Sequence, residues 1–307
     1  MEKRREMRIE ASPAVEGTCI RCGLGSAIAV RNRKNDITVR RVRRDSLFRE
    51  TAARIPLFRG AARPFFCVSD LFASLKESEA LSPQQAEKGT RFEAKTARLF
   101  RVPPETHSAR LSAAVFLILT VLLTAVLPRL ADTLLAGVDG LTDTAVSAIV
   151  LACTLAGLMI DIKLCSGLRV FRRICAYSAA STHVINAYAI YGHNITMEQI
   201  RKCSGYARFS DAAFLFYTAV VSLAAAAFLP VPEVIWLRVP IRAGIFLLAA
   251  ALVDEPYRRL EQAHSRSLGA IVRDLVMRVQ GLWLRKPDGS MYETALCAFE
   301  AIADELP

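Results

Sequence analysis

The side chains best suited to hold a metal ion in this chain are cysteines and histidines, and the sequence groups few of them. Cys19 and Cys22 form a C-x-x-C motif, which can supply half of a zinc site or a redox pair. A second Cys or His pair does not follow at the spacing of a zinc ribbon. His183 and His193 are two further candidate ligands, and the sequence pairs neither with a carboxylate at metal-site spacing.

Sequence motifs of nucleotide binding and hydrolysis are also missing. The chain has no Walker A loop, G-x-G-x-x-G, H-E-x-x-H or G-x-S-x-G. The eight cysteines are scattered rather than arranged as a dense extracellular framework, which favours a reducing compartment. We therefore expect no catalytic residue and no cofactor, and we lean against an enzyme.

Long apolar blocks dominate the second and third quarters of the chain. Leu111–Leu127 and Ala212–Leu229 carry no charged side chain and, as helices, are long enough to cross or nearly cross a bilayer. Ala145–Ile160 is weaker, and Val234–Val253 is interrupted by Arg238 and Arg242, so it could be short or re-entrant. The working topology has four spans, at residues 111–131, 143–162, 212–230 and 234–253.

The distribution of charge predicts how these spans are oriented. The first 110 residues hold 23 Lys or Arg against 13 Asp or Glu, and residues 161–211 hold seven against three. Residues 128–143, in contrast, hold one Arg against three Asp. Because basic segments stay on the cytoplasmic side, we expect a multi-pass protein of the cell membrane with both termini in the cytoplasm.

Shorter patterns divide the chain into three regions. Residues 26–33 and 37–42 predict a β-hairpin, and Ser82-Pro83 predicts the start of a polar helix that runs to about Phe100. The regions are a basic cytoplasmic part at 1–104, a membrane part at 105–253 with a cytoplasmic loop at 161–211, and cytoplasmic C-terminal helices at 254–307. The predicted fold class is a mainly α, polytopic membrane protein with a small N-terminal region of β-hairpin and helices.

Three further patterns concern individual helices. Thr196 and Ser290, each followed three residues later by Gln or Glu, predict capping boxes that start two helices. The spacing of apolar residues after Pro64 predicts one apolar stripe on a helix, with Asp70 and Lys76 pointing elsewhere. The residues of this stripe are Phe65, Val68, Phe72 and Leu75.

Several segments, taken in order, resemble the bacterial YqhQ-like family, whose members are membrane proteins built on a domain of unknown function. The resemblance covers about Ala14 to Ile302. Each segment alone is a weak signal. The segments that carry it are Glu16–Arg21 with Ala27–Arg31, Ile55–Gly60, Tyr177–Asn186, Ser204–Phe214 and Arg285–Asp288.

This family's two central segments offer His, Glu and Cys side chains, a donor set that suits zinc or iron. The resemblance implies that this chain has replaced those donors and is a divergent member. His183 is displaced by one residue from the last family histidine, which turns it to a different helix face. The replaced positions are Ser178, Ser181, Thr182, Ala207 and Ser210.

The basic N-terminal region predicts a negatively charged partner. Anionic lipid explains its charge well, since each Lys or Arg near a bilayer contributes roughly 1 kcal/mol. Aromatic residues for base stacking are absent from the basic run, which argues against nucleic acid. The predicted lipid-binding residues are Arg40, Arg41, Arg43 and Arg44.

Three functions remain open from the sequence. The first is a non-catalytic, membrane-bound interaction or scaffold component. The second is a membrane-bound, metal-dependent enzyme with a rearranged site, and the third is a transporter or channel for small solutes.

Overall fold

The computed structural model describes most of the chain. The protein is mainly helical, with an antiparallel sheet at its N-terminus. The predicted helix from Ser82 to Phe100 and the side chain of Arg44 lie outside the described residues. The described residues are 9–22, 25–32, 34–43, 47–81, 108–135, 143–167, 169–207, 210–229, 235–261, 274 and 277–303.

The sheet has four strands in sequence order, each antiparallel to the next. The predicted hairpin is β3 (Gly25–Arg31) with β4 (Ile37–Arg43), and Asn35 takes the left-handed conformation that its turn needs, with φ of 71°. The sequence analysis missed β1 (Ile9–Ala14) and β2 (Gly17–Cys22). The predicted hairpin is therefore half of a larger sheet.

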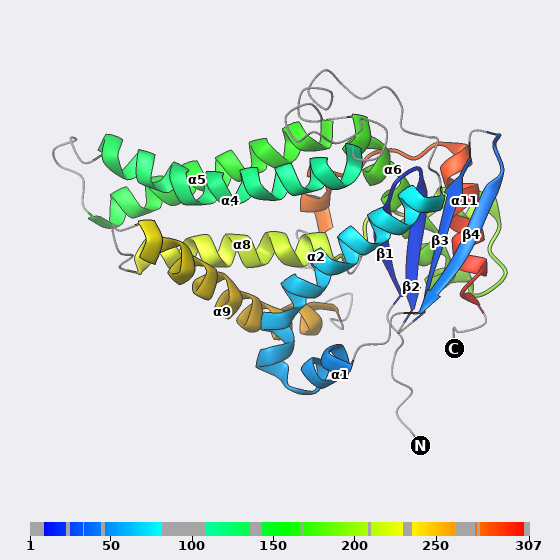
Figure 1. Ribbon diagram of the computed structural model, residues 1–307, viewed down its shortest axis with the longest axis horizontal. Coiled ribbons are helices and arrows are strands. Elements are labelled where there is room, and N and C mark those ends of the chain that lie inside the picture. The colour runs from blue at the N-terminus through cyan, green and yellow to red at the C-terminus, as the bar shows by residue number, and fades with distance from the viewer. Residues whose placement is uncertain are drawn as a thin grey trace.

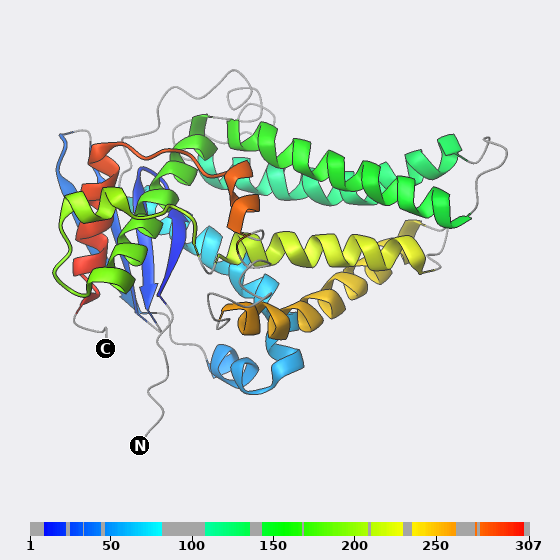
Figure 2. The same cartoon turned by 180° about the vertical axis from the view of Figure 1, so that it is seen from behind.

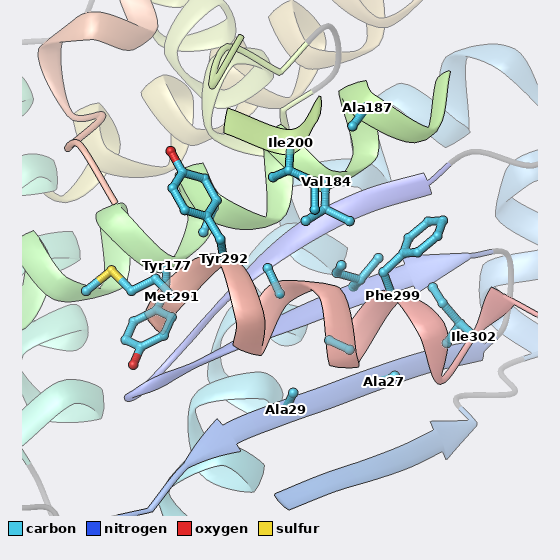
Figure 3. Packing of buried hydrophobic residues seen from close by; sticks show 14 of the residues in the cluster. Ala27, Ala29, Tyr177, Val184, Ala187, Ile200, Met291, Tyr292, Phe299 and Ile302 are labelled. Atoms are coloured by element: carbon cyan, nitrogen blue, oxygen red, sulfur yellow. The ribbon is translucent and has the colours of Figure 1, made fainter. Parts of the chain in front are cut away.

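Helices cover both faces of this sheet. On one face lies the C-terminal half of α2 (Pro56–Leu81), where the Ser74 hydroxyl donates to the Pro13 carbonyl at 2.7 Å. On the other face lie α6 (Arg169–Tyr191) and α11 (Gly289–Glu300), seen in front of the sheet in Figure 2. The main core forms between these two helices, α7 (Met197–Lys202) and the sheet (Figure 3).

The C-x-x-C motif lies on β2, and its geometry argues against a shared site. Successive side chains of a strand point to opposite faces, so residues three apart do not face the same way. Cys22 lies in the main core with α6 and α11, whereas Cys19 packs with Ile28 and Val30 on the face toward α2. The two thiols are thus separated by the sheet.

Four long helices extend away from the sheet side by side (Figure 1). They are α4 (Ser108–Leu135), α5 (Asp143–Gly167), α8 (Asp211–Phe228) and α9 (Ile235–Glu261), and each contains one of the four predicted spans or nearly all of it. Within the described residues one helix segment, Ala145–Ser166, is long and apolar enough to cross a membrane, and Asp211–Ala227 is a shorter apolar helix.

The segment predicted as a cytoplasmic loop, 161–211, is mostly helical. It contains the end of α5, all of α6 and all of α7. The charges in this segment reflect the exposed face of α6 and α7, because the opposite face of α6 is buried against the sheet and α11. The count of charged residues thus placed this segment outside the apolar blocks, but it did not reveal that the segment is helical.

The predicted stripe on α2 is divided between two environments. Leu75 is buried, whereas Phe65 is exposed. Asp70, expected to point elsewhere, is also buried, because it forms ion pairs beneath the helix. α2 follows α1 (Leu47–Arg54) and extends beyond the sheet. Its N-terminal half packs against α9 and its C-terminal half against the sheet, so residues on one face of the helix meet different partners.

The helix caps were predicted with mixed success. Thr196 and Gln199 form the expected capping box at α7. The expected cap at Ser290 is wrong, because Asp288 caps α11 and accepts from the Met291 amide at 2.9 Å. Ser290 instead donates to Asp288 from inside the first turn.

Candidate functional site: a buried arginine–carboxylate network

A network of ion pairs lies where the sheet, α2 and the α8–α9 pair meet. Asp254, near the C-terminal end of α9, has a side chain that is 1% exposed. Its carboxylate accepts from Arg59 Nε at 2.8 Å and from Arg63 Nη1 at 2.9 Å. Arg258 Nε, one turn further along α9, lies 3.1 Å from the same carboxylate.

Arg63 extends the network from α9 to α8. Its Nη2 lies 3.4 Å from Asp211 Oδ1, in the first turn of α8. The guanidinium also stacks over the Phe214 ring, with 4.1 Å between Cζ and the ring centroid, and lies 5.5 Å from that of Tyr257. Arg63 therefore holds α2 to both α8 and α9 through charge and cation–π contacts.

Arg21 connects the same network to the sheet. From β2 its guanidinium reaches Asp211 Oδ2 at 3.1 Å, Glu10 Oε2 at 3.0 Å and the carboxylate of Asp70. Arg49 of α1 donates to Asp70 as well, at 2.9 Å. We call these residues the ionic joint: Arg21, Arg49, Arg59, Arg63, Arg258, Glu10, Asp70, Asp211 and Asp254.

The electrostatics of the joint keep Asp254 and Arg63 charged. Burial alone would raise the pKa of Asp254, but hydrogen bonds from Arg59 and the charges of Arg258 and Arg63 lower it. Burial opposes the charge of Arg63, yet the nearby carboxylates of Asp211 and Glu10 outweigh that effect and raise its pKa. Burial, and then the charge of Asp211, raise the pKa of the Cys67 thiol, which stays protonated. A carboxylate held by two or three arginines is a poor proton carrier and a good structural anchor.

Close backbone contact accompanies the joint. A Cβ added at Gly60 would lie 2.7 Å from Ala251 Cα and 2.8 Å from the Ala250 carbonyl oxygen. Only a glycine allows α2 and α9 to approach this closely. Arg59 and Gly60, adjacent in the Ile55–Gly60 segment, thus serve one contact, the crossing of α2 over α9.

The five positions at which the resemblance implies lost metal donors lie on two neighbouring segments. Ser178, Ser181 and Thr182 are on α6, where the Ser181 and Thr182 hydroxyls donate to carbonyls one turn back, those of Tyr177 and Ser178. Ala207 and Ser210 lie between α7 and α8. These side chains serve the helix and its packing.

Side-chain amides and a phenol bind the described residues between α7 and α8. Asn186 donates to the carbonyls of Ser204 and Tyr206, at 2.7 and 3.0 Å. The buried Gln280 accepts from the Ala207 amide at 3.0 Å and donates to its carbonyl at 2.7 Å. The Tyr257 hydroxyl donates to the Ser210 carbonyl at 3.3 Å, and the Ser210 hydroxyl caps α8. These hydrogen bonds hold Ser204–Ala207 and Ser210, the described residues on either side of positions 208–209, beside the ionic joint.

The two candidate histidines have separate surroundings. His183 Nδ1 lies 3.2 Å from the Ile200 carbonyl, at the end of α7, and its ring is edge-on to Tyr292. Burial lowers the pKa of His183, although contacts with the carbonyls of Ile200 and Cys203 oppose that shift. His193 is exposed and packs edge-on to Tyr188. Across the residues that the structure describes, no three His, Cys, Asp or Glu side chains are grouped as a metal site would need.

Comparison with protein families identifies the chain. The family model described as protein of unknown function, DUF1385, matches residues 55–305. The chain belongs to the DUF1385 family. Searches of curated proteins and of solved structures give no match.

The DUF1385 region begins at α2 and includes α11, so the four strands precede it. Arg59, Arg63, Asp211 and Asp254 lie inside the region, whereas Glu10 and Arg21 come from the sheet before it. The ionic joint therefore connects the DUF1385 region to the N-terminal sheet.

Sequence reasoning missed the ionic joint of this DUF1385 protein. Members that pair with each other lie up to 195 residues apart along the chain, as Arg59 and Asp254 do, so no local spacing reveals them. One signal was available, because Asp211 and Asp254 stand immediately beside two apolar blocks. Arg59 and Arg63 are spaced by one helical turn, which places them on one face toward such partners.

Proposed function

We propose that this DUF1385 protein is a polytopic membrane protein that acts as a non-catalytic scaffold. The observation that carries the proposal is the exposure of large apolar side chains on all four long helices. A water-soluble domain rarely exposes apolar surface of this extent. The exposed residues include Ile118, Leu119, Val126, Leu130 and Leu134 on α4, Ile149, Met159, Ile160 and Leu164 on α5, Val221 on α8, and Leu237, Ile241, Leu248 and Leu252 on α9.

The arrangement of the helices suits four spans. α4 ends and α5 begins at the end far from the sheet, and α8 ends and α9 begins at that end as well (Figure 1). With the basic regions inside, the sheet, α6 and α11 form a cytoplasmic head and the far end of the four helices faces outward. In this proposal the protein is a divergent YqhQ-like member whose donor positions have been replaced.

The ionic joint supports a scaffold function over a catalytic one. Its carboxylates are held by arginines, and its residues come from both the head and the helices. Such a joint fixes the head in one orientation at the membrane, as a platform for other molecules requires. Removing either partner of a buried ion pair is costly, so the orientation is strongly constrained.

Anionic lipid remains our proposed partner for the basic N-terminal region. Arg40 and Arg41 are exposed on β4, and the side chains of Arg43 and Arg44 lie outside the described residues. β4 is the strand farthest from the four helices in Figure 1. Lipid contact at β4 requires the head to lean toward the bilayer. If vesicle binding by the full chain does not depend on these arginines, an acidic protein is the alternative partner.

Two measurements test the proposal. Reporter fusions after residues 138 and 232 should be active only as periplasmic reporters, and fusions after 194 and 307 only as cytoplasmic ones. A periplasmic signal at 307 would overturn the four-span topology. Metal analysis of the detergent-purified protein tests the scaffold, since a stoichiometric transition metal would favour the alternative, a metal-dependent enzyme.

A further inference from the structure

The N-terminal half of α2 is amphipathic, but its charged side chains face the protein interior and its apolar side chains face outward. This is the reverse of a surface helix in a soluble protein. Arg59, Gly60 and Arg63 face inward, toward Asp254 and the backbone of α9. Large apolar side chains face outward, with Leu57 63% and Phe65 61% exposed. A surface helix in water places its charges outside and its apolar stripe inside.

Helix geometry groups the two exposed phenylalanines. A rotation of about 100° per residue puts Phe58 and Phe65 on one face, whereas Leu57, in the first turn, lies about 80–100° around the helix from them. The same rotation puts Gly60 and Arg63 on the opposite side. Ile55, in the bend before α2, is exposed as well. The apolar surface therefore spans about two turns.

This surface lies at a defined level of the four-helix region. Gly60 meets α9 at Ala250 and Ala251, where the predicted fourth span ends. Leu248 and Leu252, on the same turns of α9, are also exposed. Figure 1 shows the start of α2 beside the sheet-proximal end of α9. The apolar surface of α2 is thus level with the boundary between the proposed spans and the head.

We propose that residues 55–65 form an interfacial segment, which lies in the cytoplasmic leaflet where lipid headgroups meet the acyl chains. The inference rests on the proposed membrane location of the four helices and adds a fifth, non-spanning contact. The lipid occupant follows from continuity with α9 and from the outward apolar face, since interfacial helices bury such faces at this depth. Arg54, exposed just before the segment, is placed to meet anionic headgroups.

The consequence is a direct connection between lipid and the ionic joint. The segment that contacts lipid with Leu57 and Phe65 holds Asp254 with Arg59 and Arg63 on its other side. The depth of the helix in the leaflet is therefore fixed together with the orientation of the head.

Tryptophan fluorescence in the full chain tests the inference. The two native tryptophans are replaced (Trp236→Phe, Trp283→Phe), and one new tryptophan is placed by Leu57→Trp or Phe65→Trp. Each variant is reconstituted into phosphatidylcholine–phosphatidylglycerol vesicles that carry bromine near the carbonyl end or the methyl end of the acyl chains. We expect loss of fluorescence relative to unbrominated vesicles, with the larger loss from bromine near the carbonyl end.

Two control positions separate this inference from the proposed membrane location. Ile149→Trp, exposed on α5, should be quenched if the four helices are in the bilayer, and Ile190→Trp, exposed on α6 of the proposed cytoplasmic head, should not be. Quenching of Ile149→Trp with none at either α2 position would overturn the interfacial segment alone. No quenching at Ile149→Trp would overturn the membrane proposal and the segment with it.

The experiment includes two internal checks. These are the dependence of quenching on the position of bromine along the acyl chain and the use of two tryptophan positions on α2. A larger loss from bromine near the methyl end would place α2 in the bilayer interior and overturn an interfacial position. Leu57→Trp and Phe65→Trp each exchange one exposed apolar side chain for another, so neither disturbs a buried contact. Matching circular dichroism spectra establish that both variants are folded.

Discussion

The buried position of Asp254 predicts an unequal response of two adjacent carboxylates. Asp254→Asn keeps the shape of the side chain and removes its charge, which leaves Arg59, Arg63 and Arg258 without a shared counter-ion. Glu255→Gln is the matched control, because Glu255 also contacts Arg59, at 3.1 Å, but its side chain is 49% exposed. The two variants remove the same charge from neighbouring positions that differ in burial.

The expected magnitudes follow from that difference. Breaking a buried pair from one side costs about 3–5 kcal/mol, and the partial exposure of Arg59 and Arg258 points to the lower end, about 3 kcal/mol. An exposed pair such as that of Glu255 contributes about 0.2–1 kcal/mol. The gap of about 2 kcal/mol corresponds to more than a tenfold change in the ratio of folded to unfolded protein.

Unfolding in detergent, followed by the fluorescence of Trp283 beside Phe216 of α8, measures this gap. A second variant adds Arg63→Met to Asp254→Asn, which removes one of the uncompensated cations, so part of the lost stability should return. Equal midpoints for Asp254→Asn and Glu255→Gln would refute the reasoning. Additive losses in the double variant would refute it as well.

Acid should remove the advantage of the wild type over Asp254→Asn. The folded-state pKa of Asp254 is depressed, so the unfolded chain takes up the proton more readily than the folded one. The stability contributed by this carboxylate is therefore present above the unfolded value of 3.8 and is lost as the pH falls through the folded value. The two proteins should converge in unfolding midpoint below about pH 4.

Four further variants, one of them a control, probe other contacts. Gly60→Leu should destabilise the protein strongly in the same assay, because its side chain meets the backbone of α9, whereas Gly244→Ala, with nothing within 4 Å, should be neutral or stabilise by up to about 1 kcal/mol; similar effects at both glycines would contradict the close crossing. The lowered pKa of His183 means that the unfolded state binds its proton first, so stability should fall as the pH drops below 6.5, and His183→Gln should lack that step in a pH series of unfolding midpoints. Gln280→Ala removes the two hydrogen bonds from the side-chain amide to the backbone of Ala207 and should lower the stability by about 1–3 kcal/mol. An unfolding midpoint unchanged from the wild type would show that these two hydrogen bonds contribute nothing.

Local sequence patterns predicted the parts of the fold that are determined by residues close together in the chain. The charge-free blocks became α4 and α8, and Asn35 made the expected turn between β3 and β4. β1 and β2 were missed because Pro13 interrupts the first strand and the second mixes Gly, Thr and Arg with apolar residues. These strands depend on pairing with neighbours more than on their own composition.

The candidate site could not be predicted, for a related reason. The resemblance to the YqhQ-like family directed attention to Ser178 and Ala207, where it implies lost metal donors, whereas the structure concentrates buried charge at Asp211 and Asp254. An Asp just before an apolar block, such as Asp211, matches an ordinary helix N-terminus, because acidic side chains are favoured there. Only the fold brings Arg63 to these two carboxylates, and it also shows that Asp70 is buried.

The order in which the joint's residues are synthesised has a consequence for assembly in the cell. Arg63 precedes its partner Asp254 by 191 residues, and Arg59 precedes it by 195. At about 5–20 residues per second, these arginines wait for roughly 10–40 seconds before their counter-ion leaves the ribosome. The head therefore cannot reach its final position against the helices until the last predicted span has been made. A chain interrupted before α9 leaves Arg59 without Asp254 and Glu255 and leaves Arg63 with Asp211 alone, and such an incomplete chain is a substrate for chaperones and proteases.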